Sequence, residues 1–346
     1  MQSAHTTGGR VVAVLLVCVI WTSSCSAEHI HNRAGGTVVV VGDVHGEYDS
    51  LVALLRGVQL IDDQQRWCGN TSMLVQLGDL VDRGPRAKQV MDLMIRLQGE
   101  AAAANGSVVV LWGNHELMQL FGDFRYVHPL ELLPYAALES SDEYNAGIES
   151  VFTFLQQDVP QLPLYGSYYS ALRRSYAHHG SVSVTALRRH FKRGFFAHNR
   201  LWHPLNVYGQ WLLDVARHPL MAKVGTTLMV HAGLHERFTF HDIGVLNQQF
   251  ATSVRIALAL LEECVNLGYC HRAFGVDSMV RAVQYEQATR DGDLSHLTAP
   301  VRELFEAVTR LTAQSIIFAS DSPVWYARLC ANIILSNADI FECTHV

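Results

Sequence analysis

The sequence lacks several features that define whole classes of protein. It has no apolar run long enough to cross a membrane, because its longest candidate, Val11–Trp21, spans 11 residues and a transmembrane helix needs about 20. It has no excess of basic residues, since the formal net charge is −6, so nucleic acid is not expected as a partner. No Gly-x-Ser-x-Gly motif accompanies Ser322, which disfavours a serine hydrolase.

The short apolar run has the pattern of a secretory signal. Met1–Arg10 carries one cation and no acid, and Cys25 and Ala27 are small residues at the −3 and −1 positions of a cleavage site. This arrangement predicts a signal peptide over residues 1–27 and a mature domain over 28–346. We therefore expect a secreted or secretory-pathway protein with no integral membrane segment after cleavage. The alternative is a chain tethered to the membrane by an uncleaved signal.

Removal of the signal leaves five of the seven cysteines, an odd number. In an oxidising compartment, pairing of Cys264 with Cys270 is one option, although connectivity does not follow from sequence. Two glycosylation sequons, which begin at Asn70 and Asn105, stand in polar stretches before apolar runs and are consistent with secretion.

The rest of the chain has the pattern of an α/β layered fold. Hydrophobic residues make up 49% of the sequence and charged residues 17%, an ordinary balance for a folded domain. Short apolar runs predict strands at 37–41, 73–77, 107–112 and 226–230, and stretches with apolar residues at helical spacing predict helices at 47–56, 86–98, 246–267 and 301–317. Residues 116–225 read as a long, mostly helical insertion that caps the site.

Each of the four predicted strands runs directly into a polar turn that contains glycine. The turns are Gly42-Asp-Val-His-Gly46, Gly78-Asp-Leu-Val-Asp-Arg-Gly84, Gly113-Asn-His-Glu116 and His231-Ala-Gly233. Loops beyond the carboxyl ends of strands form the ligand crevice of α/β sheets, so we expect these turns to converge.

The residue types in these turns suit two divalent cations. Carboxylate, imidazole and amide oxygen together favour Mn, Fe or Zn over calcium. Two cations about 3.5–4 Å apart need a shared carboxylate, and Asp79 stands centrally in the set. Such a pair would convert a bridging water into a hydroxide nucleophile, while Arg83 would clamp the phosphoryl oxygens.

The four turns, in this order and spacing, resemble the signature of the phosphoprotein phosphatase superfamily of calcineurin-like metallophosphoesterases. The stretch Gly113–Val127 and the segment Asp321–Tyr326 are similar to its Shewanella-like (Shelph) branch. The resemblance implies a metallophosphoesterase β-sandwich flanked by helices. It also implies hydrolysis of a phosphomonoester, most readily on a phosphorylated protein.

The resemblance also implies roles for individual residues. One cation would be held by Asp43, His45 and Asp79, and the other by Asp79, Asn114 and His231. His115 would be the general acid and Asp82 its carboxylate partner. Arg83 and Asn114 would contact the phosphate.

The sequence departs from the family pattern near its end. The family's further histidine ligand, in a Gly-His-Thr-like turn, has no counterpart after Tyr326, and His345 is the sole late histidine. Ala327 stands where an arginine is expected, and Arg328 follows one place late. Two alternatives therefore stay open: a pseudophosphatase that binds phosphoproteins without turnover, and a phosphatase of small molecules such as dinucleoside polyphosphates.

Overall fold

The structure is a computed structural model. It describes residues 19–20, 37–124, 126–128, 131–132, 135, 194–195, 197–238, 241–269, 275–289, 292–318, 322–324 and 334–335.

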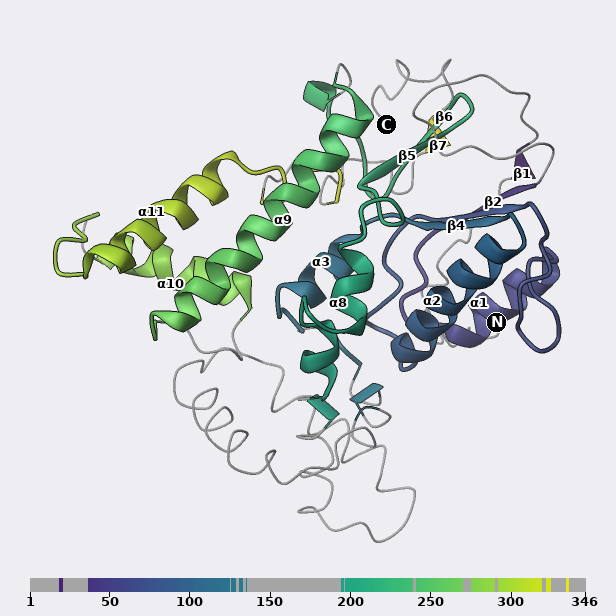
Figure 1. Ribbon diagram of the computed structural model, residues 1–346, viewed down its shortest axis with the longest axis horizontal. Coiled ribbons are helices and arrows are strands. Elements are labelled where there is room, and N and C mark those ends of the chain that lie inside the picture. The colour runs from purple at the N-terminus through teal and green to yellow at the C-terminus, as the bar shows by residue number, and fades with distance from the viewer. Residues whose placement is uncertain are drawn as a thin grey trace, which may run out of the picture.

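The strands form two sheets that are shown in Figure 1. The first has the order β1-β2-β3-β4 and the second the order β5-β6-β7. The strands are β1 (Val19–Ile20), β2 (Val38–Val41), β3 (Met73–Gln76), β4 (Ser107–Val110), β5 (Met221–Val224), β6 (Thr227–Val230) and β7 (Ile334–Leu335). β2, β3 and β4 are parallel, with Val38 opposite Met73 and Met73 opposite Ser107, whereas β1 and the strands of the second sheet pair antiparallel.

The parallel strands are buried on both faces. Val39 and Val41 of β2 belong to the large core on the helical side. Val38 and Val40 belong to a second core, which also contains Ala222 of β5 and other residues of the second sheet. Burial on both faces explains why these strands read as unbroken apolar runs instead of alternating patterns. The predicted α/β sandwich flanked by helices is confirmed.

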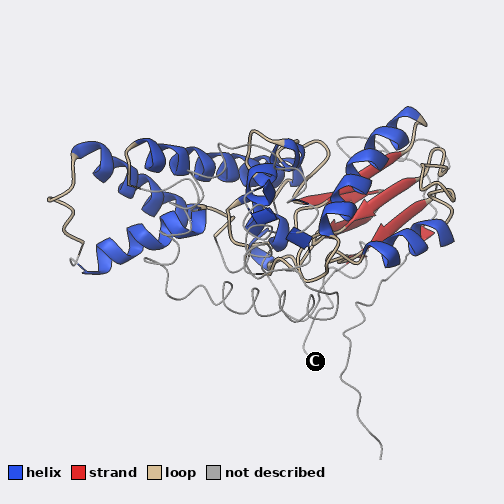
Figure 2. Cartoon of the chain, turned by 90° about the horizontal axis from the view of Figure 1, so that it is seen from below, coloured by secondary structure: helices blue, strands red, loops and turns tan. Residues whose placement is uncertain are grey.

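Two groups of helices surround the sandwich. α1 (Tyr48–Gly57) and α2 (Ala87–Ala103) cover the outer face of the parallel strands, and α2 contacts β4. α9 (Ile243–Asn266), α10 (Val276–Thr289) and α11 (Ala299–Gln314) pack on one another to one side of the sheets (Figures 1 and 2). The shorter elements are α3 (Asn114–Leu120), α8 (Val207–Leu212) and the 3-10 helix η2 (Glu236–Phe238). Among the described helices, none combines the length and apolar character that a membrane span requires.

Several predicted features fall partly or wholly outside the described residues. The signal peptide is described only at β1, so its removal stays a prediction. Most of the 116–225 insertion also lies outside, although β5, near its end, pairs with β6 as part of the sandwich. Cys264 is disulfide-bonded, and its partner lies outside the described residues because Cys68, the other described cysteine, is free.

Candidate metal centre

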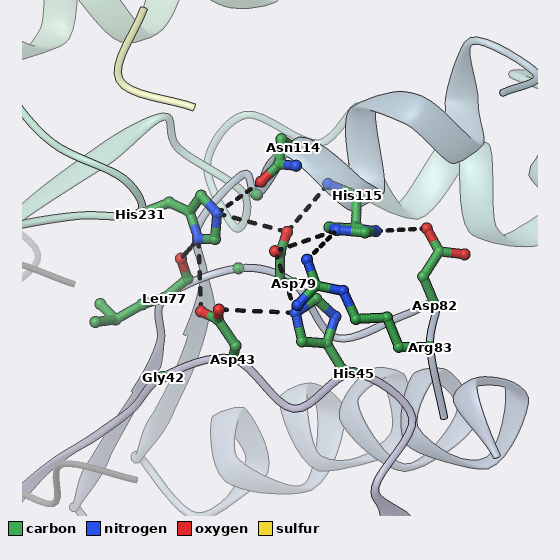
Figure 3. Close-up of polar contacts among 12 residues, drawn as sticks. Gly42, Asp43, His45, Leu77, Asp79, Asp82, Arg83, Asn114, His115 and His231 are labelled. Carbon is green, nitrogen blue, oxygen red and sulfur yellow. Dashed lines mark hydrogen bonds and ion pairs between the residues drawn. The ribbon is translucent and has the colours of Figure 1, made fainter. Parts of the chain in front are cut away.

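Side chains from the four polar turns meet in one cluster, as Figure 3 shows. Asp43 and His45 follow β2, Asp79 follows β3, Asn114 begins α3 just after β4, and His231 follows β6. Parallel strands place their carboxyl ends at the same edge, so three turns converge from the first sheet. The fourth turn, which carries His231, follows β6 of the second sheet.

Asp79 lies between two sets of potential ligands. Its Oδ2 is 3.6 Å from His45 Nε2, which in turn is 3.7 Å from Asp43 Oδ2. Its Oδ1 is 3.5 Å from His231 Nε2, which is 3.0 Å from Asn114 Oδ1. The carboxylate is 3% exposed and faces both sets at once, which is the placement that a bridging ligand needs.

Backbone carbonyls orient the two imidazoles. His45 Nδ1 lies 3.0 Å from the Val81 carbonyl oxygen, and His231 Nδ1 lies 2.8 Å from the Leu77 carbonyl oxygen. A carbonyl can only accept, so each Nδ1 carries the proton and donates it. The Nε2 atoms face carboxylate oxygens and, in His231, also Asn114 Oδ1. Each Nε2 would then be the ring nitrogen that offers a lone pair to a cation.

Two buried atoms at the centre have no hydrogen-bond partner among the described residues. Asp43 Oδ1 and His45 Nε2 are both buried and make no hydrogen bond there. Polar atoms are rarely left in this state, because burial without a partner costs about 1–3 kcal/mol. An acceptor oxygen and an acceptor nitrogen that face the same space fit a cation, so the residues present suit divalent metals.

The closest groupings of ligand atoms divide the residues in another way. His45, Asp79 and His115 form one triplet, and Asp43, Asp79 and His231 form the other. Asp79 belongs to both, whereas His115 joins a group that the family assignment does not give it. The geometry brings all the expected ligands together, and their division between two cations stays a prediction.

Glu116 links two of the turns through hydrogen bonds to their backbones. Its Oε2 accepts hydrogen bonds from the backbone N–H groups of Asp79 at 2.7 Å and Gly113 at 3.1 Å, and its Oε1 accepts one from Leu80 at 2.7 Å. Burial, with the Asp79 carboxylate as the next cause, raises the pKa of Glu116 to about 7. This carboxylate therefore fixes the position of Asp79 through the backbone.

Several residues in these turns have a backbone conformation with positive φ. His45, Asp79, Asp82 and Arg83 all have positive φ, between 46° and 69°, a region that non-glycine residues seldom occupy. Gly78 has φ +101°, and a Cβ there would lie 2.6 Å from the Gly113 nitrogen, so only glycine allows the two turns to approach this closely. Such strain gathers at functional sites.

Beside the other candidate metal ligands, His115 forms a pair with Asp82. Its Nδ1 donates to Asp82 Oδ2 at 2.6 Å, and its Nε2 accepts from Arg83 Nη2 at 3.1 Å (Figure 3). Burial lowers the pKa of His115, but the hydrogen bond to Asp82 and the nearby carboxylates of Asp79 and Glu116 outweigh it, so the pKa is raised above the ordinary value. Arg83 is also held through its backbone, because the Tyr126 carbonyl accepts its N–H at 2.8 Å.

The departures from the family pattern lie outside the described residues. This holds for Ala327, Arg328 and His345, and also for the Trp325-Tyr326 pair. Their contribution to the centre stays a prediction.

Residues 36–285 match the calcineurin-like phosphoesterase family. The match covers well over half of the 346 residues, and the chain belongs to this family. This agrees with the site just described, whose ligand types and turns suit a metal-dependent phosphoesterase.

Known relatives share parts of the chain. It is 33% identical over 124 residues to Shewanella-like protein phosphatase 1 of Plasmodium berghei, which covers 36% of this chain and 34% of the relative. It is 39% identical over 90 residues to Shewanella-like protein phosphatase 2 of Arabidopsis thaliana, with 26% and 23% covered. These names confirm the resemblance to the Shelph branch. Both alignments leave about two thirds or more of the relative unmatched.

Among solved structures, the cold-active protein-tyrosine phosphatase of a psychrophilic Shewanella species aligns with a TM-score of 0.41 and 24% identity. The alignment covers 63% of this chain and 49% of that one.

Sequence reasoning missed two buried residues of the site, Glu116 and Gln119. Glu116 stood inside the Gly113–Glu116 turn, but its role depends on backbone N–H groups from a different turn, which no spacing reveals. Gln119 follows His115 by four residues, and this helical spacing is a signal that could have paired them.

Proposed function

We propose that the chain is a metal-dependent phosphomonoester hydrolase, of the kind that removes phosphate from proteins. The observation that carries the proposal is the position of Asp79, whose two oxygens face His45 on one side and His231 on the other. A phosphoesterase that acts through two cations requires such a shared carboxylate.

The residues of the site would bind metal, bind phosphate or transfer a proton, according to where they lie. Asp43, His45 and Asp79 would hold one cation, and Asp79, Asn114 and His231 the other. When bound, two cations polarise a phosphoryl group and acidify water. Arg83 presents a guanidinium whose N–H groups match phosphoryl oxygens. When Arg83 turns from His115 Nε2 to the phosphate, that nitrogen becomes free to carry a proton. His115 would then give this proton to the leaving oxygen, while Asp82 holds the other ring nitrogen.

The protein-phosphatase assignment is supported by the two relatives, both named Shewanella-like protein phosphatases. Mn, Fe and Zn are the cations that this ligand set would favour.

Chelation and reconstitution test this proposal. We expect the purified chain to hydrolyse p-nitrophenyl phosphate, to lose turnover after EDTA treatment, and to regain it with Mn, Fe or Zn but not with Ca. Turnover that survives complete removal of metal would contradict a metal-dependent reaction. A chain that binds metal and phosphopeptide without any turnover would support the pseudophosphatase alternative.

We also propose that the chain enters the secretory pathway and is glycosylated away from the metal centre. Asn70 and Asn105 are exposed, and they precede β3 and β4 at the amino ends of these strands. The metal centre lies at the carboxyl ends, so glycans on both sequons would leave it open.

Expression of the full chain in secreting eukaryotic cells tests this placement. We expect peptide N-glycosidase to lower the apparent mass of the wild-type chain by two glycans. Asn70→Gln and Asn105→Gln should each carry one glycan fewer, and the double variant none. Phosphatase activity should be the same in all of them. An intracellular chain whose mass the glycosidase does not alter would overturn the proposal.

A further inference from the structure

A second side chain, Gln119, holds the carboxylate of Asp82. Its Nε2 donates to Asp82 Oδ1 at 2.5 Å, while His115 Nδ1 donates to Asp82 Oδ2 at 2.6 Å. Both donors belong to α3 and stand four residues apart, so they project from the same face of the helix. Two side chains of α3 thus hydrogen-bond to both carboxylate oxygens of Asp82, which lies in the loop after β3.

The contact is costly to maintain, which argues that it serves more than stability. Gln119 is 1% exposed, and its Oε1 has no hydrogen-bond partner among the described residues. A buried amide with one unsatisfied end costs about 1–3 kcal/mol. An apolar side chain would remove that unsatisfied oxygen but would take the Gln119 donor away from the buried Asp82 Oδ1, so the amide is kept for its contact with Asp82. The amide must direct its nitrogen at Asp82, because a carboxylate accepts and cannot donate to the oxygen.

We infer that Gln119 is a positioning residue for the proposed proton donor His115. By fixing the plane of the Asp82 carboxylate, it keeps Oδ2 in line with His115 Nδ1. The imidazole then stays oriented with Nε2 toward Arg83 and the metal ligands. Without Gln119, Asp82 can rotate about its terminal torsion, and the ring loses its fixed orientation.

The inference rests on the proposed function and predicts an effect that depends on the leaving group. An alkoxide or phenolate of high pKa needs a proton as it departs, whereas p-nitrophenolate leaves readily without one. General acid catalysis contributes about 10²–10⁴-fold, and a misaligned acid loses part of that contribution. The loss should therefore grow with the pKa of the leaving group.

The test compares kcat for a series of aryl phosphates between wild type, Gln119→Met and Gln119→Asn. Methionine keeps the length and helix preference without the donor, and asparagine keeps the amide one methylene too short. For both variants we expect about a tenfold loss on phenyl phosphate and less than about a twofold loss on p-nitrophenyl phosphate, with little change in KM.

Gln98→Met is the matched control. Gln98 is also a buried amide, but it bonds to Trp211 and the Val108 carbonyl, away from the metal centre. Its substitution should leave the leaving-group dependence as in wild type. If both Gln119 variants lose kcat equally on every ester, or lose none, the positioning role of Gln119 is wrong. The proposed function would still stand. A wild-type chain that hydrolyses none of the esters would overturn the proposed function and this inference with it.

Discussion

Replacement of Asp79 by Asn should lower kcat on p-nitrophenyl phosphate by on the order of 10³-fold or more. The asparagine side chain would keep the shape and one oxygen but lose the charge and the second acceptor. Since Asp79 faces His45 and His231 with separate oxygens, the change weakens both proposed cation sites at once. Steady-state kinetics with saturating Mn measures the effect.

The Asp79→Asn protein should nevertheless fold. In the metal-free chain Asp79 lies close to Asp43 and Glu116, and removal of one buried negative charge relieves repulsion among them. We expect the thermal midpoint of the metal-free variant to be no lower than that of metal-free wild type. Asp49→Asn is the control for the chemical change, because Asp49 is an exposed carboxylate bonded to Arg86 on the surface. An Asp79→Asn chain that keeps most of its turnover would contradict the shared-ligand role.

Replacement of Glu116 by Gln should destabilise the chain by roughly 2–4 kcal/mol. Glu116 accepts three backbone N–H bonds, and a buried donor that loses its acceptor costs about 1–3 kcal/mol. The amide puts an N–H₂ group against at least one of these donors. Burial and repulsion with Asp79 raise the pKa of Glu116 to about 7, and the neutral amide relieves both. The expected loss therefore comes from the buried N–H group that the amide leaves without an acceptor.

Urea unfolding of metal-free protein measures this effect, and Glu100→Gln provides the comparison. Glu100 also accepts a backbone N–H, from Trp67 at 2.7 Å, but it is partly exposed and outside the metal centre. We expect Glu100→Gln to lower the free energy of unfolding by less than about 1 kcal/mol. Equal effects of the two substitutions would show that Glu116 has no special role in fixing the turns.

Much of the framework could be predicted from the sequence, because it follows from local signals. The runs that became β2, β3, β4 and β6 were short and apolar, with valines most frequent in β2 and β4. The polar turns after them carried glycine at the points of close approach. The predicted helices at 47–56 and 86–98 agree with α1 and α2 within a few residues, except that α2 continues to Ala103.

The elements that were missed depend on tertiary context. β5 has the sequence Met-Ala-Lys-Val and becomes a strand by pairing with β6. α10 carries only a weak apolar stripe and packs against both α9 and α11. In the site, the roles of Glu116 and Gln119 arise from contacts across turns, with Asp79 and Asp82 more than thirty residues away in sequence. The ligand-bearing turns could be read locally, whereas the side chains that hold them in place could not.

The central claim is that Asp79 is shared by two cations, and anomalous scattering from crystals of the Mn-loaded chain tests it most directly. We expect two anomalous peaks about 3.5–4 Å apart, one on each side of the Asp79 carboxylate, with His45 beside one and His231 beside the other. A single peak, or two peaks that do not both contact Asp79, would contradict the claim.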